Sequence, residues 1–388
     1  MRASDLTILE LDPGSFRRTH SVLREGVKDG VAPGFVAGIW SARDPCRAFI
    51  TAIGSRRTLP SVQPMRVDTV FDLASVTKIY ATSMLAAVFV ERGWLSYDTP
   101  IAQFFPSYGH RAIRVEHLLS HTAGFAAWAP FWERMRERFA PKAVEKASIA
   151  RRQQAAREWV LAVEPEARVG ERALYSDISF LLLGFALEEV AKMPLDEAVA
   201  RFVWDPLGVE RSRYVRVTRD AAAQRARAWS AKVAATEDSA WRGGMLQGQV
   251  HDDNCWSMGG YAGHAGAFGD ARDLLHFARR LCTGYLSPRV LAKVWGRVPE
   301  PKDCERTLGW DTPSSGESML GSRMPRGSVG HWGFTGTSLW IDPASRFAVT
   351  LLSNRVHPTR ENTRIKAFRP RFHDALMLDL SGDSSQNS

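Results

Sequence analysis

The sequence has few cysteines, no long hydrophobic run and no recognisable leader segment. Its 388 residues include 4 Cys, and none of them forms a CxxC pair, which excludes a disulfide scaffold and predicts reduced thiols. The longest apolar runs, near 84–90 and 180–187, are far shorter than the ~20 residues that a membrane span needs. The first residues lack the apolar stretch of a secretory signal. We therefore expect a cytoplasmic protein with no membrane partner.

Lysine is also scarce: the 51 basic residues, against 42 acidic ones, include only nine Lys, and the net charge is +9. A positive charge is compatible with a nucleic-acid binder. The densest basic patches, 134–138 and 151–152, are however interleaved with Glu or Ala at helical spacing, which favours a solvated helix face. No helix-turn-helix, zinc-finger or RNP pattern is present. We therefore expect no nucleic-acid partner.

Strand-like segments lie at both ends of the chain. The apolar runs 34–40 and 48–53 are bounded by Asp, Pro and Gly and predict a β-hairpin. Near the other end, 337–341 and 347–352 flank the turn 342–346 and predict a second hairpin. Amphipathic or apolar helical patterns occupy most of the remaining chain, at 14–30, 77–92, 148–163, 179–192, 195–202, 271–281 and 361–379.

This order predicts an α+β fold that is similar to an α/β sandwich. The two chain ends would join in one antiparallel sheet flanked by helices, and the middle would form a helical insertion. We expect a single catalytic unit over 1–388. It would comprise a sheet subdomain from 1–74 and 305–380, a mainly helical subdomain from 75–304 and a disordered tail from 381–388.

A Ser-x-x-Lys motif, Ser75 to Lys78, offers a nucleophile beside an amine. If a helix begins at Ser75, the two side chains lie on one face within reach of each other. The residues that follow are apolar almost all round, which predicts a buried helix and a buried Lys78. Burial lowers the pKa of a lysine, and a neutral amine next to a hydroxyl can act as a general base. The alternative interpretation is an exposed N-cap serine beside a solvated lysine.

Two further segments carry groups suited to acyl transfer. Tyr175 precedes an apolar helix, so its phenol can point into a cleft and pass protons. The sequence GHWGFTGT at 330–337 leads into a predicted strand, where glycines permit a substrate to approach the backbone and N–H groups can bind an oxyanion. The alternatives are a half-buried Tyr with a satisfied hydroxyl and a simple Gly-rich turn.

In this order, the three motifs resemble those of the penicillin-recognising serine enzymes, and in particular the class C β-lactamase-related group. That group includes D-alanyl-D-alanine carboxypeptidases and serine esterases, and the resemblance implies a β-lactamase/transpeptidase-like fold with its site between sheet and helices. It covers about residues 30–355 and rests on DTVFDLASVTK (68–78), VEHLLSHTAGF (115–125), YSD (175–177), GGYAGHAGAF (259–268) and GFTGTSLWIDP (333–343).

The resemblance also implies roles for individual residues. Ser75 would be the acylated nucleophile, Lys78 its base, and Tyr175 a proton carrier for the leaving group and the deacylating water. The backbone N–H groups of Ser75 and Phe334 would form the oxyanion hole. The substrate-binding positions would be Asp177, His331, Trp332 and Gly333.

Two departures from the family pattern bear on the substrate. Asp177 stands where the family usually has Asn, and a carboxylate repels an anionic substrate. Trp332 stands where the family usually has Thr or Ser, so the hydroxyl that helps to hold a substrate carboxylate is missing. We therefore expect a small, neutral, partly apolar ester or amide as substrate, with Trp332 as one wall and Trp128 and Trp132 as candidates for others.

The sequence thus predicts a serine hydrolase that forms an acyl-enzyme on Ser75 and hydrolyses carboxylic esters. The alternatives are a D-Ala-D-Ala-type carboxypeptidase or weak β-lactamase, and a non-catalytic relative used as a binding or scaffold module. No metal or other cofactor is expected, since His117 and His121 have zinc-ligand spacing but lack the Glu of HExxH. The oligomeric state is left open.

Overall fold

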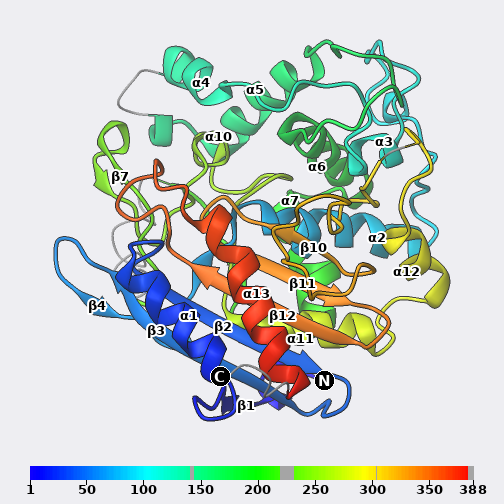
Figure 1. The fold of residues 1–388 in the computed structure, drawn as a ribbon. Helices are drawn as coiled ribbons and strands as arrows, with labels where there is room; N and C mark the ends of the chain where they lie inside the picture. The colour runs from blue at the N-terminus through cyan, green and yellow to red at the C-terminus, as the bar shows by residue number, and fades with distance from the viewer. Residues whose placement is uncertain (140–143, 219–230, 303, 383–388) are drawn as a thin grey trace.

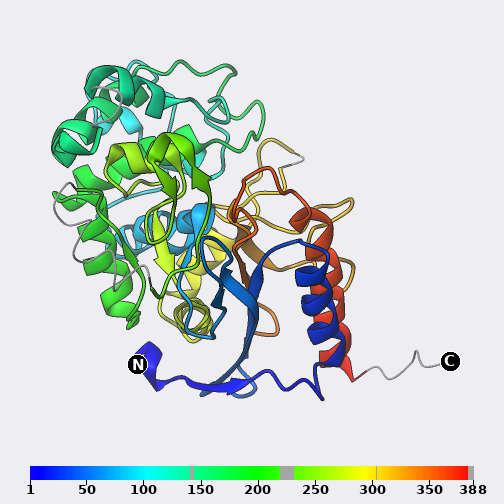
Figure 2. The same cartoon turned by 90° about the vertical axis from the view of Figure 1, so that its left-hand side faces the viewer.

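A seven-stranded sheet lies between two layers of helices in the computed structural model, which describes residues 1–139, 144–218, 231–302 and 304–382 (Figures 1 and 2). Its strands follow the order β1-β3-β2-β12-β11-β10, with β4 paired to β3. Both ends of the chain therefore contribute to one sheet. The strands are β1 (Thr7–Glu10), β2 (Gly34–Ser41), β3 (Arg47–Arg57), β4 (Gln63–Pro64), β10 (Val329–Trp332), β11 (Ser338–Asp342) and β12 (Phe347–Ser353).

The α+β fold and both hairpins are confirmed. Strand β2 pairs with β3, and β11 with β12, each antiparallel. The antiparallel pair β12–β2 joins the two chain ends. The expectation of a wholly antiparallel sheet is wrong at one edge, where β1 pairs parallel with β3. Strand β1 is short and mostly exposed, so its sequence carries no alternation from which this pairing follows.

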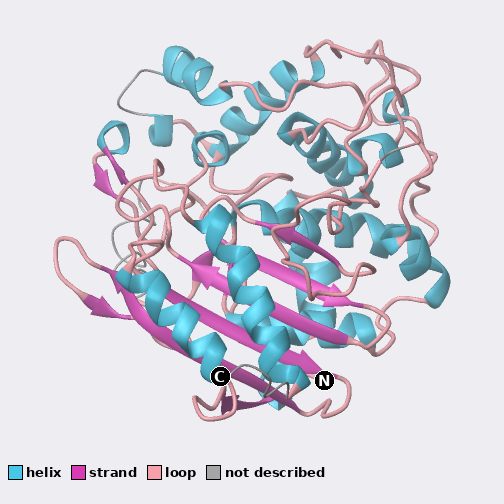
Figure 3. Ribbon diagram, viewed as in Figure 1, coloured by secondary structure: helices cyan, strands magenta, loops and turns pink. Residues whose placement is uncertain are grey.

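Alternating side chains of the central strands form two cores. On β2, Phe35, Ala37 and Ile39 face α1 (Arg17–Lys28) and α13 (Ile365–Ser381). Val36 and Trp40, which occupy the alternate positions of the strand, belong to the core on the opposite face. This period of two is that of a strand buried on both sides. Figure 3 shows α1 and α13 lying across one face of the sheet.

The middle of the chain forms the helical part above the sheet in Figure 1. One helix of this stretch, α11, packs on β2 and β12 and covers the second face of the sheet. The helices are α2 (Ser83–Glu91), α3 (Val115–Leu119), α4 (Phe131–Phe139), α5 (Ile149–Leu161), α6 (Asp177–Ala191), α7 (Leu195–Val199), α8 (Asp205–Leu207), α10 (Asp253–Met258), α11 (Ala271–Cys282) and α12 (Pro288–Trp295). In the part of the chain that the structure describes, no helix combines the length and apolar character required to span a bilayer.

This middle region also contains short strands that the sequence analysis did not predict. They form a three-stranded sheet, β5-β9-β6, and a β7-β8 pair. The final helix begins at Ile365, later than expected, and continues to Ser381, while most of the predicted tail, 383–388, lies outside the described residues. The short strands are β5 (Phe71–Asp72), β6 (Arg213–Tyr214), β7 (Asp238–Ser239), β8 (Gly244–Met245) and β9 (Ala267–Gly269).

The contact between α1 and α13 depends on Gly26. A Cβ atom at this position would lie 2.5 Å from the ring of Phe368, which stacks on Phe35 with ring centroids 4.8 Å apart. Overpacking costs about 1–3 kcal/mol, whereas Ala gains only about 1 kcal/mol over Gly in a helix. We expect Gly26→Ala to lower the free energy of unfolding in urea denaturation. Gly109→Ala, where no atom lies within 4 Å, is the control and should change it by less than about 0.5 kcal/mol; a more stable Gly26→Ala variant would contradict this packing.

Candidate active site

A cavity of about 920 Å³ lies where the sheet meets the helical part. Its walls come from the segment after β5, the start of α6, the edge strand β10 and the N-terminal half of α13. Seven of the predicted site residues line the cavity: Ser75, Tyr175, Asp177, His331, Trp332, Gly333 and Phe334. The eighth, Lys78, is fully buried behind Ser75.

Ser75 and Lys78 meet through a 3₁₀ turn followed by a wider π turn and not through a regular α-helix. Ser75 lies in a 3₁₀ turn, η2 (Ala74–Val76), and Lys78 begins a π turn, η3 (Lys78–Thr82), that leads into α2. Residues three apart eclipse one another in 3₁₀ geometry. The Lys78 Nζ atom accordingly donates a hydrogen bond of 3.0 Å to Ser75 Oγ.

Lys78 is held by acceptors from three parts of the chain. Besides Ser75, its ammonium group donates to Asp177 Oδ1 at 2.7 Å and to the carbonyl oxygen of His264 at 3.0 Å. Burial by itself lowers the pKa of Lys78, but the Asp177 carboxylate, and after it Tyr175, raise that pKa above its ordinary value. The predicted shift toward a neutral amine is therefore wrong in direction, because the sequence pattern did not show that Asp177 faces Lys78.

Tyr175 donates the second hydrogen bond to Ser75, the predicted nucleophile, with 2.8 Å between the phenol oxygen and Ser75 Oγ. Ser176 caps α6 through its side chain, and its N–H donates to His121 Nδ1 at 3.0 Å. The rings of His121 and Tyr175 lie 4.7 Å apart. The histidine of the HLLSHTAG segment thus orients the tyrosine. Burial raises the pKa of Tyr175, so the phenol is protonated at neutral pH.

The turn 333–337 ties the sheet to the nucleophile segment. The hydroxyl of Thr335 donates to the Asp72 carbonyl at 2.7 Å, and that of Thr337 donates to the Leu73 carbonyl at 3.0 Å. A Cβ atom on Gly333 would lie 2.6 Å from the Leu73 oxygen, so only glycine fits there. Since β10 is the edge strand of the sheet, this turn faces the cavity.

The two predicted oxyanion donors are available for a ligand. Among the described residues, neither the N–H of Ser75 nor that of Phe334 has a hydrogen-bond acceptor in the protein. Ala74 stands immediately before the nucleophile with φ of 46°, and its own N–H donates to Asp72 Oδ1. A non-glycine residue in this left-handed region is strained. Ser75, the next residue, lies at the wall of the cavity.

The other residues that were predicted to contact the substrate differ in where they lie relative to the cavity. His331 is buried, and desolvation together with the charge of Lys78 holds the pKa of its imidazole well below the usual range, so it is neutral. Trp332 forms part of the cavity wall, as does Trp128, which is 48% exposed. Trp132 does not line the cavity; its ring stacks on Trp241 at 4.8 Å instead.

Several residues of the site escaped the sequence analysis. Arg306 lies with its guanidinium 5.3 Å from the centre of the Tyr175 ring. Arg369 reaches the turn 333–337 from α13. Neither belongs to a motif, and no periodic pattern indicates that distant arginines converge here. Asp252 also lines the cavity, and its carboxylate accepts a hydrogen bond from His264 Nε2 at 2.9 Å.

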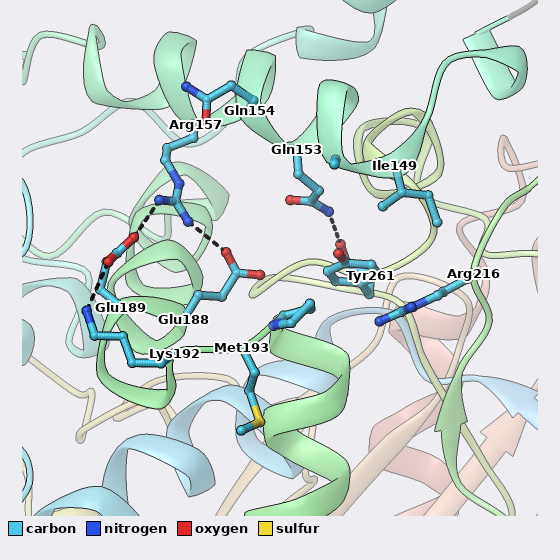
Figure 4. Close-up of a pocket in the computed structure, with 12 residues that line it drawn as sticks. Ile149, Gln153, Gln154, Arg157, Glu188, Glu189, Lys192, Met193, Arg216 and Tyr261 are labelled. Carbon is cyan, nitrogen blue, oxygen red and sulfur yellow. Dashed lines mark hydrogen bonds and ion pairs between the residues drawn. The ribbon is translucent and has the colours of Figure 1, made fainter.

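A second hollow of about 460 Å³ lies on the helical part and is shown in Figure 4. Charged side chains that line it form ion pairs with one another: Arg157 pairs with Glu188 at 3.1 Å and with Glu189 at 2.6 Å. Gln153 donates to the backbone oxygen of Tyr261 at 3.1 Å. None of the predicted site residues lines this hollow. We therefore place the candidate active site in the larger cavity.

Residues 20–369, most of the chain, match the model of the Beta-lactamase family. The chain belongs to the Beta-lactamase family. This confirms the resemblance inferred from the motifs, and with it a serine-hydrolase fold. The matched region includes every residue of the site described above.

Relatives and similar structures agree with this assignment. A protein of Salmonella typhimurium named "Putative D-alanyl-D-alanine carboxypeptidase" is 28% identical over 77% of this chain and 72% of its own length. The structure of EstCE1, a hydrolase with promiscuous acyltransferase activity, shares the fold with a TM-score of 0.68 and 22% identity, covering 94% of this chain and 99% of that one. Simvastatin synthase (LovD) of Aspergillus terreus does so with a TM-score of 0.69 and 17% identity, covering 97% of this chain and 100% of its own.

The Asp177–Lys78 ion pair leads to a prediction about pH. In Asp177→Asn the largest cause that raises the pKa of Lys78 is lost while burial, which lowers it, remains. The inflection in log kcat/KM that reports formation of the free amine should therefore move to lower pH than in the parent enzyme. Glu189→Gln, in an ion pair outside the cavity, is the control. An inflection that does not move would mean that Asp177 does not set the protonation of Lys78.

Proposed function

We propose that this member of the Beta-lactamase family hydrolyses small carboxylic esters through an acyl-enzyme on Ser75. The observation that carries the proposal is the double contact on the nucleophile. Ser75 Oγ lies 3.0 Å from Lys78 Nζ and 2.8 Å from the Tyr175 hydroxyl, at the wall of a large cavity. A nucleophile within hydrogen-bond reach of two proton-transferring groups is the arrangement that covalent acyl transfer requires.

Lys78 and Tyr175 supply the proton path. The free-amine form of Lys78, which the Asp177 carboxylate at 2.7 Å makes less populated, accepts the proton of Ser75. Ser75 Oγ forms a bond to the ester carbonyl carbon, and the carbonyl oxygen takes up the electron pair as an oxyanion. When the ester C–O bond breaks, the leaving alkoxide receives a proton from Lys78 or Tyr175. Water then releases the acid from Ser75 by the same steps.

The groups nearest to Ser75 favour a neutral ester. Asp177 adds negative charge beside the nucleophile, and the neutral His331 provides no cation for a substrate carboxylate. Trp332 and the half-exposed Trp128 offer apolar surface for an acyl chain or an apolar alcohol. EstCE1, a hydrolase with acyltransferase activity, has the same fold and supports acyl transfer as the chemistry of this site.

A D-alanyl-D-alanine carboxypeptidase is the second candidate, since that activity stands in the name of the Salmonella relative. Such a substrate ends in a carboxylate. The missing hydroxyl at Trp332 and the carboxylate of Asp177 both disfavour it. A non-catalytic scaffold is disfavoured for a different reason: a fully buried lysine is costly to keep, and a binding module has no use for one beside a serine.

The direct test compares Ser75→Ala with the parent enzyme on p-nitrophenyl butyrate. We expect the parent to turn the ester over and the variant to fall to the buffer rate with its thermal unfolding unchanged. Ser21→Ala, a serine on the exposed side of α1, is the control and should retain full activity. Turnover by Ser75→Ala above the buffer rate would refute an acyl-enzyme on Ser75.

Selectivity provides a second test. Trp332 contacts Trp340, with ring centroids 4.8 Å apart, and its replacement by Thr restores the hydroxyl of the family pattern. We expect Trp332→Thr to raise kcat/KM for a carboxylate-bearing ester relative to its methyl ester. Trp332→Val, which opens the same space without a hydroxyl, separates hydrogen bonding from volume. An unchanged ratio of the two rates in Trp332→Thr would overturn this account of the substrate.

A further inference from the structure

A buried arginine lies directly behind the predicted oxyanion hole. Arg369, on α13, is 5% exposed. Its Nη2 atom donates to the carbonyl oxygens of Gly333 at 3.2 Å and Thr337 at 3.3 Å. Its guanidinium lies 4.4 Å from the centre of the Trp332 ring. Among the described residues, no carboxylate forms an ion pair with it.

The hydrogen bond from Arg369 to the Gly333 carbonyl is important because this carbonyl belongs to the same peptide group as the Phe334 N–H. The Gly333 carbonyl and the Phe334 N–H are the two ends of one planar peptide unit. A cation that is hydrogen-bonded to the carbonyl draws electron density through that unit and makes the N–H a stronger donor. Among the described residues, this N–H has no hydrogen-bond acceptor in the protein.

The same contacts fix the direction of the N–H. The Gly333 oxygen also accepts from Gly336 N at 3.1 Å, and Gly333 N donates to the Thr337 oxygen at 2.7 Å. Arg369 bridges the two carbonyls of this turn, so the plane of the 333–334 peptide cannot rotate without breaking several bonds. Arg355 makes a different contact: its Nε donates to the Phe334 oxygen at 2.7 Å, which belongs to the next peptide unit.

Burial without a carboxylate partner lowers the pKa of Arg369 to about 9, so the side chain is still a cation at neutral pH. An uncompensated buried charge is costly to retain unless it is bonded, and here the bonds are two carbonyl groups and an aromatic face. This charge is bonded to the carbonyl end of the 333–334 peptide, opposite its N–H, and Arg369 also lines the cavity.

We propose that Arg369 is a positioning residue for catalysis, which polarises and orients the 333–334 peptide so that the Phe334 N–H stabilises the oxyanion. The proposal rests on the ester hydrolysis proposed above. The positive charge acts when the substrate carbonyl oxygen becomes negative, that is, in the transition state rather than in the bound ester. Its loss should therefore reduce kcat and leave KM nearly unchanged.

The test measures kcat and KM of Arg369→Met on p-nitrophenyl butyrate, together with inhibition by phenylboronic acid, which mimics the tetrahedral intermediate on a serine. We expect kcat to fall by about tenfold, less than the 10²–10³-fold loss on deleting an oxyanion donor, with KM within about threefold. The affinity for the boronic acid should fall by the same factor as kcat/KM. Arg369→Lys, which keeps the charge, should recover part of both.

Arg152→Met is the matched control. Arg152 is also fully buried and donates to backbone carbonyls, those of Val217, Trp256 and Ser257, but does not line the cavity. This variant should lose thermal stability and keep the kcat of its folded fraction. An Arg369→Met enzyme with the parent kcat and boronic acid affinity would overturn the proposal. So would a loss confined to carboxylate-bearing esters, which would make Arg369 a substrate-binding residue.

Two further outcomes are distinguishable. If Arg369→Met does not fold, Arg369→Gln, which can still donate hydrogen bonds but has no charge, carries the same comparison, and parent values of kcat and boronic acid affinity in that variant would overturn the proposal. If the parent enzyme shows no Ser75-dependent turnover, both the proposed ester hydrolysis and the role of Arg369 are refuted. Turnover that depends on Ser75 but not on Arg369 refutes the role of Arg369 alone.

Discussion

A buried ammonium group organises this active site. Lys78 has no exposed surface, so all of its hydrogen bonds must be made within the protein. Its acceptors are the nucleophile, a carboxylate at the start of α6 and a backbone carbonyl of the segment before β9. The need to satisfy one cation therefore brings together three segments that are distant in the sequence, and it also fixes where Ser75 lies.

The sheet contributes the other half of the site through a single turn. Residues 333–337 are bonded on one side to the backbone before Ser75 and on the other side to Arg369 of α13. In the proposed mechanism, the helical part provides the groups that move protons and one oxyanion donor, the N–H of Ser75, and the edge of the sheet provides the other, the N–H of Phe334. Their geometry is coupled because the same turn contacts both parts.

The sequence was sufficient for the parts of the fold that have local signals. The hairpins β2–β3 and β11–β12 follow from apolar runs separated by turn residues, and α6 follows from its long apolar pattern. Strand β1 escaped prediction because four mostly exposed residues have no pattern. Within the site, the motifs indicated which side chains take part. They did not indicate that Asp177 pairs with Lys78, that Trp132 turns away, or that Arg306 and Arg369 approach, since these contacts are between residues far apart in the chain.

The strand order β12–β2 at the centre of the sheet has a consequence for biosynthesis. The ribosome makes β2 early and β12 more than 300 residues later, so the central pair of the sheet cannot form before the residues of β12 have been added to the chain. In the proposed mechanism, Ser75 has no oxyanion donor from Phe334 until that pair of strands has formed. On that mechanism, a growing chain does not hydrolyse esters before the centre of its sheet is complete.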